Sequence, residues 1–298
     1  MERMGKVLIL GSGPAGISAA LYARRSGAEV RVVFKGYGTS ALSRAELIQN
    51  YYGLAVPLSG AELERHGIEG AKAVGVELVE DELIGLEFRE DFRGFRGVSS
   101  TQAYEADCLI IAAGASRKAP PLPGLTRLEG HGVSYCAICD GFFYRGKTVA
   151  VLGSGEYALH EAKALLPHAS KVLLFSNGEK TEAELPKGVE LHAKRLVAIE
   201  GEERITGASF TDGSRIPIDG LFVAIGTAGS TDLARRLGVM LDGENIKVDA
   251  HMCTNVPGVF AAGDCTGGLL QNSKAVQEGA EAGLSAVKFL RSLEEGKT

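Results

Sequence analysis

The residues with the clearest capacity for redox chemistry are Cys136 and Cys139, a Cys-x-x-Cys pair followed directly by Asp140. Two cysteines at this spacing can form and break a disulfide at a helix N-terminus, and a disulfide stores two electrons. Half of a zinc site is the alternative, but the sequence has no second Cys-x-x-Cys and no histidine pair at ligand spacing. We therefore expect a redox disulfide, no metal, and Asp140 as the acid that protonates a departing thiolate.

The other three cysteines carry less information. Five cysteines are too few for a disulfide framework, so a reducing compartment, the cytoplasm, is expected. Cys108 lies in an apolar segment and is expected to be an inert core thiol. Cys253 precedes a turn and fits either role. Cys265 follows Gly263-Asp264 and could approach a cofactor, although a small buried residue is the simpler interpretation.

A glycine-rich turn near the N-terminus indicates dinucleotide binding. The apolar run 6–10 predicts a buried strand, and Gly11-Ser12-Gly13-Pro14-Ala15-Gly16 follows it and opens a helical pattern that ends at Gly27. A second apolar strand is expected over 30–34. In this context the glycines let backbone N–H groups approach a pyrophosphate at a helix N-terminus. The acidic residue that usually ends the second strand is replaced by Lys35-Gly36-Tyr37-Gly38.

The same pattern occurs a second time. A strand is expected over 148–152, a Gly-Ser-Gly turn with Ala158 at the third glycine position over 153–158, a helix before Pro167, and a strand over 171–175. Later landmarks repeat as well, in the order 76–78, 83–87 and 107–114 in the first copy, and 189–191, 196–200 and 219–226 in the second. The stretches between them alternate as in a small antiparallel meander.

The predicted fold class is therefore α/β, with two Rossmann-like, three-layer dinucleotide-binding domains. The second is inserted in the first, and each has a small antiparallel meander. Pro120, Pro121, Pro123 and Gly124 indicate a stiff linker after the first domain. We expect residues 1–116 and 247–298 to form one domain and residues 117–246 to form the other, with the second crossing near Gly243 to Lys247.

Composition excludes several classes of function. With 45% hydrophobic and 23% charged residues in 298, the chain has the composition of a soluble globular protein long enough for two domains. No apolar run approaches the roughly 18 residues of a membrane helix. Residues 1–5 do not resemble a secretory leader. The net charge of −5 argues against a nucleic acid partner.

Taken together, these motifs resemble the low-molecular-weight thioredoxin reductase family over essentially the whole chain. The resemblance depends on the order of the motifs and above all on the Cys-x-x-Cys-Asp-Gly-Phe-Phe segment. The matching segments are Gly11 to Gly16, Asn50 ahead of Tyr51-Tyr52-Gly53, Ala112 to Ala115, Cys136 to Tyr144, Gly220 to Gly226, and Val259 to Asp264.

The resemblance implies a homodimer that passes electrons through FAD to the cysteine pair and on to thioredoxin. The second domain would rotate to carry the dithiol outward and bring a nicotinamide in. Asn50 would lie near the flavin and Asp264 would bond its ribitol. By the same resemblance Cys136 attacks the partner and Cys139 faces the flavin, an order that the sequence itself leaves open. The implied FAD-binding residues are Gly11, Ser12, Gly13, Pro14, Ala15, Gly16, Lys35, Leu42, Asn50, Ala113, Gly114, Gly263, Asp264, Lys274 and Ala275.

The chain departs from this family at the nicotinamide site. NADPH-using members end the strand corresponding to 171–175 in a cluster of arginines that pair with the 2′-phosphate. Here the segment 176–182 reads Ser-Asn-Gly-Glu-Lys-Thr-Glu, with Lys180 as its one cation. Losing two charge-assisted hydrogen bonds costs roughly 3–6 kcal/mol. Glu179 could serve an NADH ribose instead, although it does not stand at the strand end. In the FAD half, the Gly-Gly-Gln-Leu and Arg-Gln-Ala stretches of the family are also altered, to the residues at 38–42 and at 273–275.

We therefore expect the branch of the family that takes electrons from reduced ferredoxin and does not use pyridine nucleotides. One alternative is a reductase that uses NADPH or NADH through an unusual pocket. Another is a flavin-binding regulatory protein or scaffold, which the intact Cys-x-x-Cys-Asp argues against. Ferredoxins are acidic, so docking needs basic side chains, and the candidates are Arg24, Arg25, Lys35, Arg93, Arg96 and Lys163.

Overall fold

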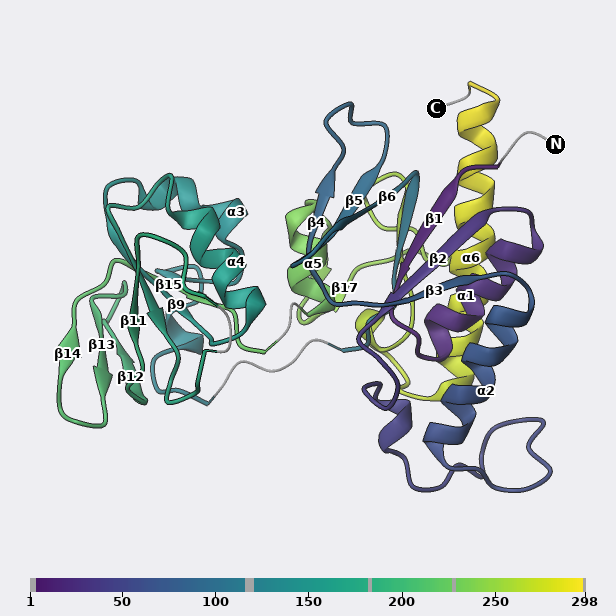
Figure 1. The fold of residues 1–298 in the computed structure, drawn as a ribbon, viewed down its shortest axis with the longest axis horizontal. Coiled ribbons are helices and arrows are strands. Elements are labelled where there is room, and N and C mark those ends of the chain that lie inside the picture. The colour runs from purple at the N-terminus through teal and green to yellow at the C-terminus, as the bar shows by residue number, and fades with distance from the viewer. Residues whose placement is uncertain (1–3, 116–120, 182–183, 227–228, 297–298) are drawn as a thin grey trace. The chain divides into compact units, whose positions relative to one another are not determined.

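The chain folds into two compact units, one inserted in the other (Figure 1). The computed structural model describes residues 4–115, 121–181, 184–226 and 229–296. Unit 1 consists of Met1–Ser116 and Gly229–Thr298, and unit 2 consists of Arg117–Ala228. Each unit has its own parallel sheet and its own meander, as the sequence repeat predicts.

The sheet of unit 1 is five-stranded and parallel, in the order β18-β7-β1-β2-β3. Its strands are short and most of their residues are apolar, and every residue of β7 is buried, which fits a sheet covered on both faces. The strands are β1 (Lys6–Leu10), β2 (Glu29–Phe34), β3 (Glu77–Glu80), β7 (Cys108–Ile111) and β18 (Val259–Ala261). Strands β1 and β2 confirm the expectations for 6–10 and 30–34.

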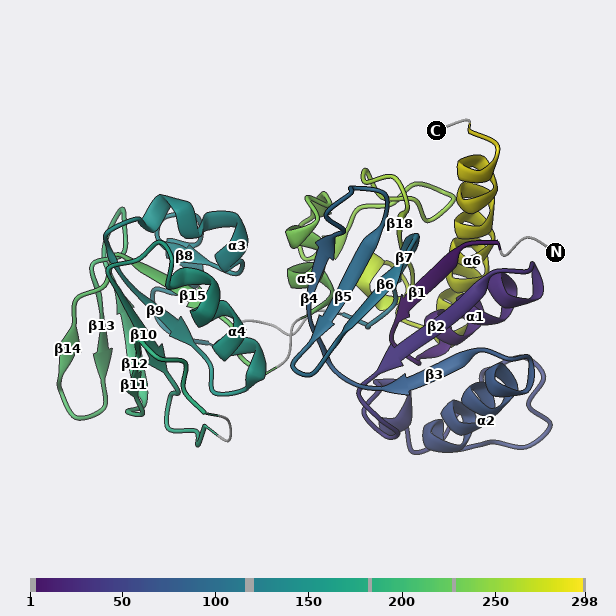
Figure 2. The ribbon, with the colours of Figure 1, turned by 45° about the horizontal axis from the view of Figure 1, so that its top comes forward.

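Three helices cover one face of this sheet and a meander covers the other (Figure 2). Alternate residues of β1 face the two layers, because Val7 and Ile9 join the helix-side core whereas Leu8 contacts Gly97 of the meander. The helices are α1 (Pro14–Arg25), α2 (Gly60–Ala73) and α6 (Asn272–Glu294). The meander strands are β4 (Leu83–Phe88), β5 (Phe95–Ser99) and β6 (Ala103–Ala106).

The second boundary between the units lies between Ala228 and Gly229, not at 246/247 as the sequence analysis placed it. Residues after 228 belong to unit 1 because helix α5 (Ser230–Arg236) packs against β4, and the Ser230 hydroxyl donates to the Gly114 carbonyl at 2.6 Å. A hairpin of β16 (Leu241–Asp242) and β17 (Asn245–Ile246) follows. The glycine signal near 243 therefore marks a hairpin turn and not a domain crossing.

Unit 2 repeats the sheet order of unit 1, as β11-β10-β9-β15-β8, all parallel. The fifth position, however, is filled by β8 (Val133–Ser134), which precedes the first strand of the repeat in sequence. The other strands are β9 (Thr148–Leu152), β10 (Lys171–Phe175), β11 (Val189–His192) and β15 (Gly220–Val223). The meander is β12 (Leu196–Glu200), β13 (Gly207–Phe210) and β14 (Arg215–Ile216).

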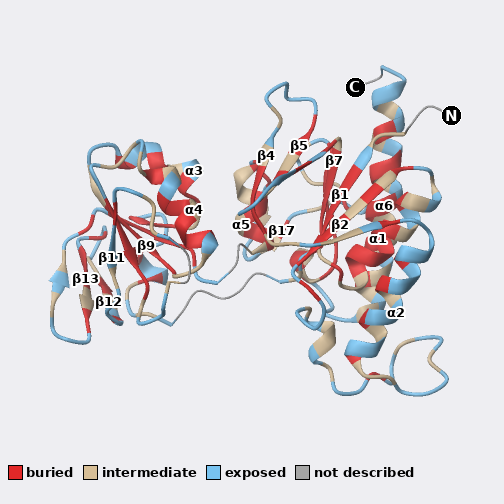
Figure 3. Ribbon diagram, viewed as in Figure 1, coloured by how far each residue is buried: buried red, intermediate tan, exposed pale blue. Residues whose placement is uncertain are grey.

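Two helices of unit 2 bear on the candidate site, α3 (Ala137–Asp140) and α4 (Glu156–Leu165). Short 3-10 turns are η1 (Leu42–Arg44), η2 (Thr126–Leu128), η3 (Gly141–Tyr144) and η4 (Asp264–Thr266). Buried residues concentrate on the central strands of each unit (Figure 3). No helix in the described part of the chain has both the length and the apolar character that a membrane span requires.

Candidate active site

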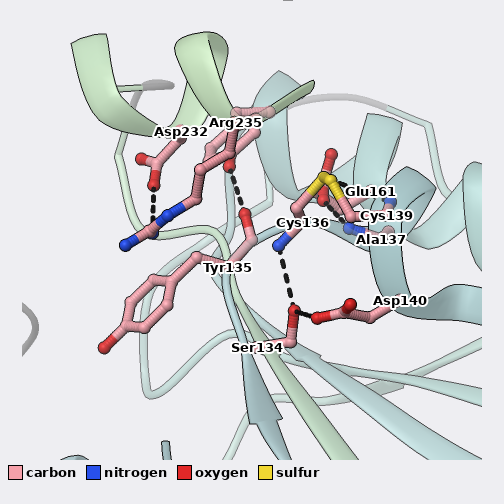
Figure 4. Close-up of a disulfide and its surroundings, with 10 residues drawn as sticks. Ser134, Tyr135, Cys136, Ala137, Cys139, Asp140, Glu161, Asp232 and Arg235 are labelled. Carbon is pink, nitrogen blue, oxygen red and sulfur yellow. Dashed lines mark hydrogen bonds and ion pairs between the residues drawn. A yellow bond between two sulfur atoms is a disulfide. The ribbon is translucent and has the colours of Figure 1, made fainter. Parts of the chain in front are cut away.

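Cys136 and Cys139 form a disulfide at the carboxyl end of the sheet in unit 2 (Figure 4). Strand β8 ends at Ser134 and the short helix α3 begins at Ala137, so the pair lies where β8 leaves the sheet. The strands are parallel, so the second glycine-rich turn, which follows β9, lies at the same edge. Open α/β sheets bind ligands at this edge. The fold thus places a redox group where such folds place their chemistry.

The two cysteines differ in exposure. Cys136 is 3% exposed, whereas Cys139 is an exposed residue. The Cys136 Sγ accepts the backbone N–H of Cys139 at 3.2 Å. After reduction this N–H would stabilise a thiolate on Cys136. The buried sulfur is therefore the one that the backbone stabilises as an anion, and the exposed sulfur is the one that a large partner could reach.

Asp140 is joined to the disulfide segment through a serine that the sequence analysis did not identify. The Ser134 Oγ donates to Asp140 Oδ2 at 2.7 Å and accepts the backbone N–H of Cys136 at 3.1 Å. Figure 4 shows the Asp140 carboxylate turned toward Ser134. The only sequence signal for Ser134 was its position two residues before Cys136. The carboxylate acts on this segment through the Ser134 hydroxyl.

A second carboxylate, that of Glu161, is bonded to the first residue of helix α3. Glu161 on α4 is 1% exposed, and its Oε2 accepts the backbone N–H of Ala137 at 2.6 Å. This N–H lies in the first turn of α3, where a helix has no internal acceptor. Glu161 was also missed, although an acidic residue within the buried stripe of the predicted helix was a usable signal.

Large apolar side chains next to the two cysteines in sequence are exposed on the surface of unit 2. Ile138, Phe142 and Phe143 are 51%, 60% and 70% exposed. The Arg145 guanidinium lies over the Phe142 ring, 5.2 Å from its centroid. Clustered exposed aromatic side chains beside an arginine are typical of protein-binding surfaces.

The first glycine turn has the geometry that a pyrophosphate needs. Gly11 has φ +102°, and a Cβ there would lie 2.5 Å from the Ala112 carbonyl oxygen. A Cβ on Gly16 would lie 1.9 Å from the Gly11 carbonyl oxygen, so only glycine lets α1 approach β1. A Cβ on Gly13, in contrast, would meet open space. Gly13 is thus the position where a ligand can approach the backbone, and the turn fits a dinucleotide.

A cavity of about 220 Å³ opens beside this turn. Residues expected to bind FAD line it together with residues from distant parts of unit 1. The expected FAD residues in its lining are Ser12, Gly13, Pro14 and Leu42, and the residues from other segments include Tyr51 and Asn272. Asn50 lies close by, since its Nδ2 donates to Gln271 Oε1 at 3.1 Å beside Asn272.

The remaining expected FAD residues differ in their surroundings. Ala113 and Gly114 follow β7 at the same sheet edge, and Ala15 and Ala275 are buried. Lys35 follows β2, and its ammonium pairs with Glu82 at 3.4 Å.

The Lys274 ammonium is bonded to groups within unit 1. Its three N–H groups face four acceptors, which are Gly263 O (2.8 Å), Thr266 Oγ1 (2.9 Å), Gly267 O (2.6 Å) and Glu278 Oε2 (2.9 Å). The side chain is thus bonded within the protein in this structure, and direct contact between Lys274 and FAD stays a prediction.

The three cysteines outside the pair are free thiols whose pKa values burial raises. Cys108 and Cys265 are fully buried, and burial raises the pKa of both, that of Cys265 to about 12. The Cys265 thiol also donates to the Ile111 and Ala262 carbonyls, so it is a core residue. Partial burial, followed by the Asp249 carboxylate, raises the pKa of Cys253.

The segment after β10, where NADPH-using members of the family carry arginines, has none over 176–182. Asn177 has φ +53°, and its Oδ1 accepts the N–H of Leu196 at 2.8 Å, so the side chain is bonded to the meander. Ser176 is 1% exposed. Sequence reasoning missed Arg195, whose Nε would lie 3.7 Å from a Cβ at Gly178. The turn after β10 therefore has a cation nearby, Arg195, which comes from the connection between β11 and β12.

Two dinucleotide-type folds, with a redox disulfide at the sheet edge of the second, define a disulfide oxidoreductase of the flavoprotein type. The chain belongs to the family described as pyridine nucleotide-disulphide oxidoreductase, which matches residues 5–279. Within it the chain is similar to thioredoxin reductases. That of Aquifex aeolicus is 32% identical over 305 residues, covering 97% of this chain and 94% of the relative.

Solved structures agree. The atypical thioredoxin reductase of Desulfovibrio vulgaris Hildenborough is 36% identical with a TM-score of 0.89, covering 96% of this chain and 98% of that one. A ferredoxin-flavin thioredoxin reductase from Clostridium acetobutylicum is 33% identical with a TM-score of 0.70, covering 97% and 98%. The chain is thus an enzyme of the thioredoxin reductase type, and the family resemblance and fold class expected from the sequence are confirmed.

Proposed function

We propose that the protein is a homodimeric flavoprotein that reduces thioredoxin with electrons from reduced ferredoxin. FAD would lie at the first glycine turn. The observation that carries this proposal is the contrast between the two turns. The first turn offers an open approach at Gly13, whereas β10, the strand after the second turn, is followed by Ser176 and Asn177 in place of arginines.

FAD bound at the first turn would supply two electrons to the Cys136–Cys139 disulfide. Reduction of the disulfide also takes up protons, and Asp140, which the Ser134 hydroxyl holds beside the cysteine segment, would be the acid that supplies one. The Cys139 thiolate would then attack the partner's disulfide and form a mixed disulfide. Attack by Cys136 on the Cys139 sulfur would release the reduced partner and restore the internal disulfide.

The exposures of the two sulfurs favour this order, which reverses the one implied by the family resemblance. The exposed apolar side chains of Ile138, Phe142 and Phe143 support a protein as the disulfide substrate. A small-molecule disulfide would not need three large apolar side chains near the site. Thioredoxin is the partner named for the relatives.

The electron donor is proposed from charge. A 2′-phosphate needs several cations, and the turn after β10 offers Lys180 between Glu179 and Glu182, with Arg195 nearby. The similarity to a ferredoxin-flavin thioredoxin reductase supports ferredoxin instead. Arg25, Arg93 and Lys163 are exposed and remain candidates for docking an acidic donor, whereas Arg24 donates to the Val74 and Ala28 carbonyls. An NADPH-dependent reductase is the second candidate, and Arg195 is the residue that favours it.

The deciding experiment is anaerobic stopped-flow absorbance of the purified protein with NADPH, NADH and reduced ferredoxin in parallel. We expect ferredoxin to bleach the flavin and both nicotinamides to do so very slowly or not at all. Fast bleaching by micromolar NADPH would replace the ferredoxin assignment with a nicotinamide-dependent one. Chromatography of the acid-released chromophore should give FAD, and recovery of FMN or of no flavin would refute the cofactor assignment.

A further inference from the structure

The turn between β18 and α6 is held by a pair of charged residues on the first turns of α6. Lys274 donates to the carbonyls of Gly263 and Gly267, at both ends of the turn. Glu278, one helical turn later, accepts the N–H of Gly263 at 2.8 Å and the hydroxyl of Thr266 at 2.9 Å. Lys274 and Glu278 also pair with each other at 2.9 Å. Together they bind the backbone of the turn at three places.

This pair is shielded from water. The side chains of Lys274 and Glu278 are 16% and 12% exposed, whereas the other described ion pair of α6, His251–Glu281, has a histidine side chain that is 72% exposed. Shielded charge-assisted hydrogen bonds are stronger than exposed ones, and removing one partner leaves the other charge unsatisfied. The turn is therefore fixed by the most protected charges on this helix among the residues that the structure describes.

The turn in question lies against the first glycine turn. Gly263 has φ +87°, and a Cβ there would lie 2.8 Å from the Cβ of Ala15, at the start of α1. Asp264 is the next residue and begins η4. The position of the backbone at 263–267 therefore decides where the Asp264 carboxylate stands relative to Gly13, the open approach for a dinucleotide.

We propose that Lys274 and Glu278 are positioning residues for FAD. They hold the 263–267 turn so that Asp264 reaches the ribitol while neither of them touches the cofactor. The inference rests on the FAD site of the proposed function and extends it to two residues. It also gives Lys274, which stands in the Arg-Gln-Ala stretch of the family as Ser-Lys-Ala, a role different from that of a flavin ligand.

The test compares binding of FAD and ADP to the apoprotein, because ADP has the pyrophosphate but no ribitol. The variants are Lys274→Met and Glu278→Gln. The matched control is Glu281→Gln, which breaks an exposed pair on the same helix. We expect both variants to bind FAD at least tenfold more weakly than the wild type and ADP within twofold of it. The control should bind both ligands as the wild type does. Because the two residues act as a unit, the double variant should lose less than the product of the two single losses.

Equal losses of FAD and ADP affinity would show that the pair merely supports the fold and would overturn the inference. Wild-type FAD affinity in Glu278→Gln would also overturn the inference. This variant is nearly isosteric, so it serves as the test if Lys274→Met does not fold. If the wild-type apoprotein itself binds ADP but not FAD, the proposed function fails instead, so the two failures can be told apart.

Discussion

At the residue scale, the chemistry depends on an asymmetry between two cysteines three positions apart. Strand β8 delivers Cys136 into the interior and α3 brings Cys139 out to the surface. The N–H of Cys139 faces the Cys136 sulfur, so the thiolate that forms on reduction is best stabilised at the buried position. An exposed attacking thiol and a buried resolving thiol is the arrangement that this geometry favours.

Single cysteine variants should reveal this asymmetry. With Cys136→Ser, the exposed Cys139 should form a mixed disulfide with a thioredoxin whose resolving cysteine has been replaced and whose remaining cysteine is activated. With Cys139→Ser, the adduct should form at least tenfold more slowly because Cys136 is 3% exposed. Non-reducing electrophoresis over time measures both rates, and the double variant serves as the blank. A faster reaction of Cys139→Ser would restore the opposite order of attack.

Asp140→Asn should slow turnover to thioredoxin by about 10²-fold, since proton transfer by a positioned side chain contributes roughly 10²–10⁴-fold. The amide still accepts the Ser134 hydroxyl, so the local structure should persist. Flavin content should stay at the wild-type level. Asp212→Asn, which changes an exposed carboxylate of the same unit, is the control. Turnover of Asp140→Asn within twofold of the wild type would remove Asp140 from the mechanism.

At the element scale, each sheet needs its meander to cover the face that the helices leave open. In unit 1 the meander is tied to the sheet region by a hydrogen bond from the Tyr104 hydroxyl on β6 to Asp81, just after β3, at 2.5 Å. Burial, followed by the Asp81 carboxylate, raises the pKa of Tyr104 to about 12. Burial also raises the pKa of Asp81, but hydrogen bonds from Tyr104, Ser99, Glu82 N–H and Gln102 outweigh it and lower that pKa.

Tyr104→Phe should reduce the free energy of unfolding at pH 7 by about 1.5–3 kcal/mol, the range for a hydrogen bond to a charged group. The lowered pKa of Asp81 means that this carboxylate stabilises the fold above about pH 4 and that the stabilisation is lost as pH falls further. The variant should therefore lose less stability than the wild type between about pH 4 and pH 2. Urea unfolding at several pH values measures this, with Tyr22→Phe, at an exposed position, as control. Parallel acid profiles for Tyr104→Phe and the wild type would contradict the assignment.

At the scale of the whole molecule, one fold is built from two chain segments around an inserted second copy. The ends of the interruption meet, because the Ser230 hydroxyl donates to the Gly114 carbonyl at 2.6 Å. Sites at which two chain ends lie close together tolerate the insertion or removal of a whole domain. Unit 1 is thus a closed structure to which unit 2 adds the disulfide.

Excision of residues 117–228 with a short glycine-serine linker should leave a folded unit 1 that still binds FAD. Excision of 117–246 should not, because it removes α5 and the β16–β17 hairpin, which pack within unit 1. Circular dichroism, cooperative thermal unfolding and the flavin absorbance of each protein give the answer. Equal folding of both would return the boundary to 246/247.

The sequence by itself determined the repeated strand–turn–helix units, the two meanders and the redox pair. These follow from local periodicity, glycine placement and cysteine spacing, which are properties of neighbouring residues. Strands β1, β9, β10 and β12 begin and end where the patterns predicted.

Only the tertiary structure decided features that depend on contacts between distant segments. Strand β8, two residues long, has no periodicity to read, yet it sets the place of Cys136 at the carboxyl end of the sheet. The burial of Cys136, the bonds of Ser134 and Glu161 to the cysteine segment, the use of Lys274 within unit 1 and the approach of Arg195 to Gly178 all join different elements. A side chain's partner across the fold is set by packing, and no local pattern encodes it.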